Sequence, residues 1–134
     1  MKRFFFVLLL LLGAFLGGYV PSTWRARAME TTLHTTKLDL RLANLHRRLG
    51  VAAEEAQRNN YATATAAARE FFDGCSAVAQ SGSLASQPRT QIAIAAYAAQ
   101  RDEIKTALAG ANPGVRERLA GMYLAMDGVL ARKQ

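Results

Sequence analysis

LDLRLANLHRRLGVAAEEA, at residues 38–56, places a leucine or an alanine on one helical face at alternating steps of four and three residues. This spacing is a heptad pattern, the period that allows one α-helix to lie along another. The pattern continues toward the amino terminus through smaller or more polar side chains. It therefore predicts one long helix whose leucine-rich part enters a packed core and whose earlier part forms a stalk. Its positions are Trp24, Ala28, Thr31, Thr35, Leu38, Leu42, Leu45, Leu49, Ala52 and Ala56.

Three further helices are expected after residue 56, because alanine is frequent there and β-branched residues are sparse. Asn59-Asn60 suits a first break, the segment 81–88 a loop, Gly110 a helix end, and Asn112-Pro113 the start of the last helix. Short connections favour antiparallel neighbours, so residues 38–134 are expected to form a bundle of about four helices. The predicted core is Leu42, Leu45, Leu49, Phe71, Ile94, Ile104, Leu108, Leu119, Met122 and Met126, and the last helix is also expected to bury Val115 and Val129.

The amino-terminal segment predicts a membrane anchor. Two basic residues precede an uncharged apolar run, Phe4 to Val20, which would span roughly 25 Å as a helix. That length is at the short end of what crosses a bilayer core of ~30 Å. Residues 1–21 are therefore expected to be a retained transmembrane signal anchor, followed by a basic juxtamembrane stalk at residues 22–37. A cleaved signal peptide is the alternative, because Ala26-Arg27-Ala28 has the form of a cleavage site.

The expected fold class is therefore all-α, with one amino-terminal transmembrane helix, a long heptad-patterned stalk helix and a small antiparallel helical bundle. A very short basic amino terminus before an apolar run is typical of bacterial export. We accordingly expect a single-pass protein of the bacterial inner membrane, with its amino terminus in the cytoplasm and the bulk of the chain in the periplasm.

Several short motifs are spread along the chain: GYVP at 18–21, NY at 60–61, FF at 71–72, and RDEI at 101–104 before NP at 112–113. On these motifs the chain resembles uncharacterised single-span bacterial inner-membrane proteins with a periplasmic helical domain. Residues 49–72 also resemble part of one tetratricopeptide-type helical hairpin, without a second copy at the expected period. The resemblance implies an architecture and no activity.

Positive charge gathers near the predicted anchor. The chain has 17 Lys+Arg and 10 Asp+Glu, a formal net charge of +7, and most of the excess lies within residues 1–50. Anionic lipid headgroups or an acidic protein surface would suit these bases, and a solvated face without a partner is the alternative. Nucleic acid is not expected as a partner, since an exported domain rarely meets it. The expected membrane-interface residues are Tyr19, Trp24, Arg25 and Arg27, and the expected partner-binding residues are Lys37, Arg41, Arg47 and Arg48.

The sequence predicts no catalytic residue, no cofactor and no metal site. His34 and His46 are twelve residues apart on one predicted helix and point about 120° apart, so they cannot share a metal ion. Met122 and Met126 suit core packing, because no histidine opposes them and no C-x-x-C-H motif exists for haem attachment. Cys75 lies on an apolar stripe and is expected to be a buried small hydrophobe.

The expected function is therefore not enzymatic. The heptad pattern and the alanine-rich faces favour an interaction protein, such as an accessory or structural subunit or an assembly factor of a larger inner-membrane complex, for example a respiratory or photosynthetic one. The expected partners are the lipid bilayer, other membrane-protein subunits and a second copy through the stalk helix. The alternative is a periplasmic helical bundle that senses or binds a small molecule. That alternative needs a polar group inside the core, for which Arg101 is the candidate.

Overall fold

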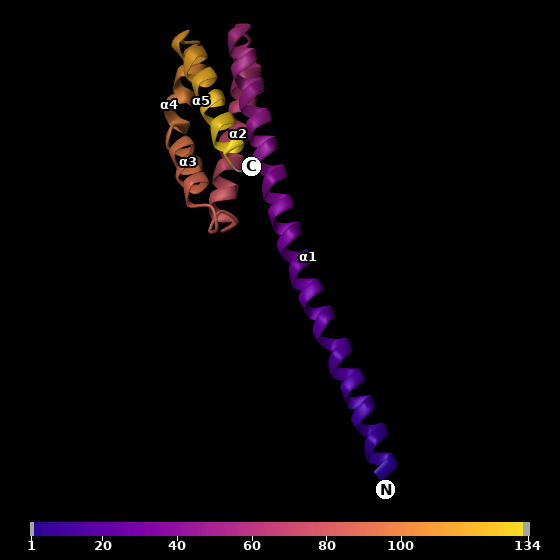
Figure 1. The fold of residues 1–134 in the computed structure, drawn as a ribbon. Coiled ribbons are helices and arrows are strands. Elements are labelled where there is room, and N and C mark those ends of the chain that lie inside the picture. Colours follow the sequence, from indigo (N-terminus) through magenta and orange to yellow (C-terminus); the bar gives the residue numbers. More distant parts are fainter. Residues whose placement is uncertain (1, 133–134) are drawn as a thin grey trace. The chain divides into compact units, whose positions relative to one another are not determined.

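Helices make up nearly all of the chain in the computed structural model, which describes the backbone of residues 2–132 and the side chains of residues 26–132. The elements are α1 (Lys2–Gln57), α2 (Tyr61–Gln80), α3 (Pro88–Ala99), α4 (Arg101–Ala109) and α5 (Gly114–Ala131), as drawn in Figure 1. The described residues contain no strand, so the prediction of an all-helical chain is confirmed. The chain divides between Lys37 and Leu38 into two compact units.

The predicted transmembrane helix is corrected by the structure. Among the described residues, no helix is long and apolar enough to cross a membrane. In α1, charged side chains follow one another at short intervals from Arg27 to Arg41, and α2 carries Arg69, Glu70 and Asp73 near its middle. A bilayer span needs about 20 predominantly apolar residues, which the described parts of these helices do not offer. The side chains of the predicted anchor, residues 1–21, lie outside the described residues.

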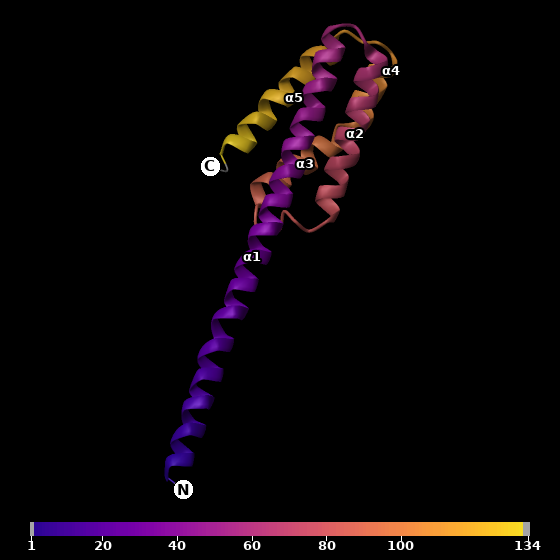
Figure 2. The same ribbon diagram turned by 90° about the vertical axis from the view of Figure 1, so that its right-hand side faces the viewer.

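The unit that starts at Leu38 is a bundle in which the end of α1, then α2, then α3 with α4, and finally α5 run alternately up and down (Figures 1 and 2). The heptad positions of α1 from Leu38 onward are all buried. This part of α1 faces α2 through Leu45, which lies against Gly74, and faces α5 through His46, whose ring stacks on Tyr123 at 4.3 Å between centroids. The leucine-rich part of the stripe therefore enters the core, as the spacing predicts.

All ten residues of the predicted core are buried, and Phe71, Leu49, Ile104 and Leu119 have no exposed surface. Phe71 lies at the centre of an aromatic group, with ring centroids 5.2 Å from Phe72 and 6.0 Å from Tyr97. Val129 is only half-buried, although the stripe of the last helix predicted it inside. Burial of this many large side chains is the main stabilising term for a bundle of this size.

The helix breaks fall at the three predicted places, which are Asn59-Asn60, the segment 81–88 and the stretch from Gly110 to Pro113. After α1, Asn59 takes a left-handed conformation with φ 60°, and the side chain of Asn60 accepts a hydrogen bond from the Thr63 N–H at 3.5 Å. Before α5, the Asn112 side chain accepts from the Gly114 N–H at 2.9 Å. After α4, however, the left-handed residue is Ala111, with φ 49°, and not Gly110.

The expected third helix is two helices. It is interrupted at Gln100, whose N–H bonds the Tyr97 carbonyl at 3.0 Å, three residues back, in place of the carbonyl four residues back. Both α3 and α4 pack against α2 and α5. Neither glycine nor proline occupies the break, so the sequence contains no local signal that predicts it.

Gly74 and Gly128 lie in helices but differ in the space beside them, so replacement by alanine is expected to have opposite effects at the two positions. A Cβ at Gly74 would overlap Cδ2 of buried Leu45, whereas a Cβ at Gly128 would have no atom within 4 Å. Overpacking costs about 1–3 kcal/mol, and alanine is favoured over glycine in a helix by up to about 1 kcal/mol. We expect Gly74→Ala to lower the free energy of unfolding and Gly128→Ala to raise it by up to about 1 kcal/mol. Urea unfolding of the full chain measures both, and equal effects of the two variants would contradict the close packing of α1 on α2.

Candidate functional site

The basic residues predicted to bind a partner differ in exposure and in their contacts. Lys37, Arg41 and Arg47 are exposed, and Nη2 of Arg47 donates to Asn44 Oδ1 at 3.0 Å. Arg48 is partly buried and forms an ion pair with Glu70 of α2. Arg48 is thus already paired with α2 at the surface of the bundle.

Among the residues predicted to lie at a membrane interface, the structure describes only the side chain of Arg27, which is exposed. The side chains of Tyr19, Trp24 and Arg25 lie outside the described residues. In the unit before Leu38, Met29 and Leu33 are 71% and 60% exposed, beside Thr32 and Thr36. Self-association through this helix stays a prediction.

The titratable groups that could carry chemistry are dispersed. His34 is exposed, and Nε2 of His46 lies 3.8 Å from Asp127 Oδ1. The Cys75 side chain is fully buried, and burial raises the pKa of its thiol to about 12. Burial also raises the pKa of Tyr97, and the neighbouring Cys75 adds to this effect. Within the part of the chain that the structure describes, no group of three or more His, Cys, Asp or Glu residues could hold a metal ion.

Arg101, the predicted polar group of the core, lies instead at the surface of the bundle. Its side chain is 42% exposed, and Nη2 donates to Asp73 Oδ1 at 2.6 Å, which joins α4 to α2. The stripe that suggested burial therefore contains an arginine whose head reaches solvent, as long cationic side chains commonly do.

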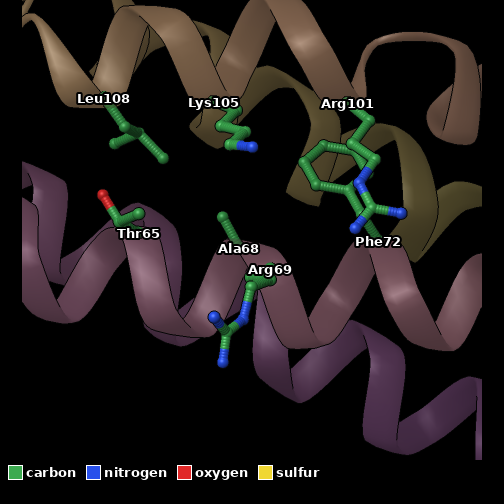
Figure 3. A pocket seen from close by; sticks show the side chains of 7 residues that line it. All are labelled: Thr65, Ala68, Arg69, Phe72, Arg101, Lys105 and Leu108. Atoms are coloured by element: carbon green, nitrogen blue, oxygen red, sulfur yellow. The ribbon is translucent and has the colours of Figure 1, made fainter.

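A pocket of about 60 Å³ opens between α2 and α4 at this place (Figure 3). Its floor is apolar and buried, made by Ala68 and Phe72 of α2 and Leu108 of α4. In Figure 3, Leu108 points toward α2 while Thr65 and Ala68 point toward α4, so the two helices close the floor from opposite sides. The Thr65 hydroxyl donates to the Tyr61 carbonyl at 2.7 Å, so its proton is already used within α2.

Three cations surround this apolar floor: Arg69 on α2, and Arg101 and Lys105 on α4. Arg101 is neutralised by Asp73. Arg69 and Lys105 are exposed and have no ion pair among the described residues. In Figure 3 the Arg69 side chain extends away from α4, whereas Lys105 lies between the two helices. The pocket is thus an apolar recess with an unbalanced positive rim.

Sequence reasoning did not find this pocket, although part of its pattern is visible. Arg101, Lys105 and Leu108 follow the four-three spacing of one face of α4, and Thr65, Ala68 and Phe72 do the same on α2. Such spacing shows that each set shares a helical face. It does not show that the two faces meet, which depends on the tertiary arrangement.

No family model matches this chain, and comparisons with curated proteins and with solved structures also produce no match.

Proposed function

We propose that this chain is a non-enzymatic helical interaction protein, an accessory subunit or assembly factor whose bundle binds another protein of a larger complex. The observation that carries the proposal is the pocket between α2 and α4, an apolar floor with three cations around it, of which two have no acidic partner in the described part of the chain. An apolar centre inside a polar or charged rim is the usual composition of a protein–protein contact.

The size of the pocket favours a protein partner over a small molecule. Sites for small molecules and cofactors commonly enclose about 300–1,000 Å³. The pocket here measures about 60 Å³, which is room for one small side chain. A small molecule bound in the core would need a polar group there, and the candidate for that role, Arg101, lies at the surface and pairs with Asp73.

The local charge at the pocket supports the same conclusion. Most of the positive excess of the chain lies within residues 1–50, so an acidic surface would be attracted here by the cations of the rim, over a distance of about a Debye length, ~10 Å in moderate salt. Unpaired exposed cations such as Arg69 and Lys105 contribute little to folding stability, since exposed charges interact mainly with water. Their position around an apolar recess gives them a use in selecting and orienting a partner.

Capture of the full-length chain from its native cells after cross-linking tests the proposal. We expect the wild-type chain to retain a stoichiometric partner protein, and the double variant Arg69→Glu/Lys105→Glu to lose it by about tenfold or more, because two attractive contacts become repulsive. Both side chains are exposed and unpaired, so the free energy of unfolding should change by no more than about 0.5 kcal/mol.

Arg89→Glu is the matched control, because Arg89 is an exposed arginine on α3 that does not line the pocket. It changes the net charge in the same direction and should retain the partner. Absence of any stoichiometric partner from the wild-type capture, or equal loss in the Arg89→Glu variant, would contradict the proposal.

A further inference from the structure

We infer that the occupant of the pocket between α2 and α4 is an acidic segment of the partner protein, which inserts one small aliphatic side chain and places a carboxylate on either side of it. This inference rests on the proposed function and specifies the chemistry of the partner.

The apolar part of the occupant follows from the volume and the lining. A cavity of about 150 Å³ accommodates a benzene ring. At about 60 Å³ the pocket is less than half as large, so it accepts an aliphatic group the size of a valine side chain and excludes an aromatic ring. Ala68, Phe72 and Leu108 offer only carbon atoms at the floor, so a polar side chain would lose its hydrogen bonds to water without replacement.

The acidic part of the occupant follows from the positions of the cations. Arg101 and Lys105 are four residues apart on α4, about 6 Å along its axis, whereas the Arg69 side chain extends away from α4 (Figure 3). The two cations of α4 therefore lie about one helical turn apart along the rim of the recess. A carboxylate before the aliphatic residue and another after it can each meet one of these two cations while the aliphatic group is inserted.

Replacement of Asp73 is a sharp test, because the expected result is tighter binding, whereas damage to the fold would weaken binding. It already holds Arg101 at 2.6 Å, so it competes with a partner carboxylate for that guanidinium. Asp73 and Arg101 are 56% and 42% exposed, and an exposed pair of this kind contributes little to stability. Replacing Asp73 by asparagine removes the competitor, and the pocket should then bind an acidic segment more tightly.

The probe is a fluorescein-labelled, alanine-based helical peptide that carries one valine with a glutamate four residues before and four residues after it. Its binding to the full chain is measured by fluorescence anisotropy at low salt. We expect Lys105→Glu to weaken binding by about tenfold, Asp73→Asn to tighten it by about threefold to tenfold, and Arg89→Glu to change it by less than twofold.

Two matched peptides isolate the two parts of the recognition. Glutamine in place of both glutamates should weaken binding by about tenfold or more, and serine in place of valine should do the same. Isovalerate, a free carboxylate with a branched aliphatic group, tests a small-molecule occupant. We expect it not to displace the peptide at concentrations below about 1 mM, because a fragment of this size has few contacts with which to offset the cost of binding.

Equal binding of the glutamate and glutamine peptides would overturn the inference, as would weaker binding after Asp73→Asn. Displacement of the peptide by micromolar isovalerate would reassign the pocket to a small carboxylate. If cellular capture depends on Arg69 and Lys105 but no acidic peptide binds, the proposed function stands and the acidic segment is wrong. If peptides bind as expected but no cellular partner is found, the pocket chemistry stands and the proposed function fails.

Discussion

Leu119→Ala is expected to lower the free energy of unfolding of the bundle by about 2–5 kcal/mol. Leu119 has no exposed surface and belongs to the cluster that joins all the helices of the bundle. Truncation removes apolar contacts from the folded state only, and the surrounding side chains fill the resulting cavity only in part. Urea unfolding of the full chain, followed by circular dichroism, measures the change.

Leu124→Ala is the matched control, since it makes the same substitution on the same helix at a side chain that is 69% exposed. Its effect should stay within about 0.5 kcal/mol, because exposed positions away from special contacts are tolerant. Similar effects of the two variants would mean that α5 does not bury the face that contains Leu119.

The thiol of Cys75 is expected to react with an alkylating reagent about a thousandfold more slowly in the folded chain than in the urea-unfolded chain at pH 8. Only the thiolate reacts, and burial raises the pKa of this thiol from 9.0 to about 12, which leaves about a thousandfold less thiolate at that pH. Exclusion of the reagent by the closed core slows the reaction further. Intact-mass measurement over time follows the modification, and comparable rates in the folded and unfolded chains would contradict the burial of Cys75.

The same shift gives stability a pH dependence of defined sign. Because the pKa of Cys75 is higher in the folded chain than in the unfolded one, loss of the proton favours unfolding. The contribution of this thiol to stability is therefore fully present below about pH 9 and decreases as the pH rises toward about 12. Cys75→Ala should remove this part of the alkaline destabilisation.

The heptad spacing predicted the core well because helical geometry alone decides which side chains share a face. Leu38 and Leu42 are on the stripe and are buried, whereas Leu40, which lies between them and is equally apolar, is 66% exposed. The same spacing also included Thr31 and Thr35, which are exposed. A period identifies a face, and only the presence of a second helix buries it.

The features that the sequence did not reveal depend on contacts between elements. Leu84 is buried although it lies in the loop before α3, because the loop folds back on the core. The break at Gln100 has no glycine or proline to mark it. Arg101 was expected inside, but Asp73, which is 28 residues away in the chain, holds its guanidinium at the surface. The pocket arises from the meeting of two faces, neither of which is unusual by itself.

The break at Gln100 also leaves α4 with only nine residues. Isolated helices shorter than about 12–15 residues are marginal in water, so α4 cannot persist on its own propensity. Its order depends on the insertion of Ile104 and Leu108 into the core and on the bond between Arg118 of α5 and Glu103, which also holds the pKa of Glu103 below its usual range. The wall of the pocket is consequently a segment whose local unfolding costs less than that of the longer helices. Any occupant that contacts α4 stabilises the helix that forms its own site, so that at this place binding and local folding are thermodynamically linked.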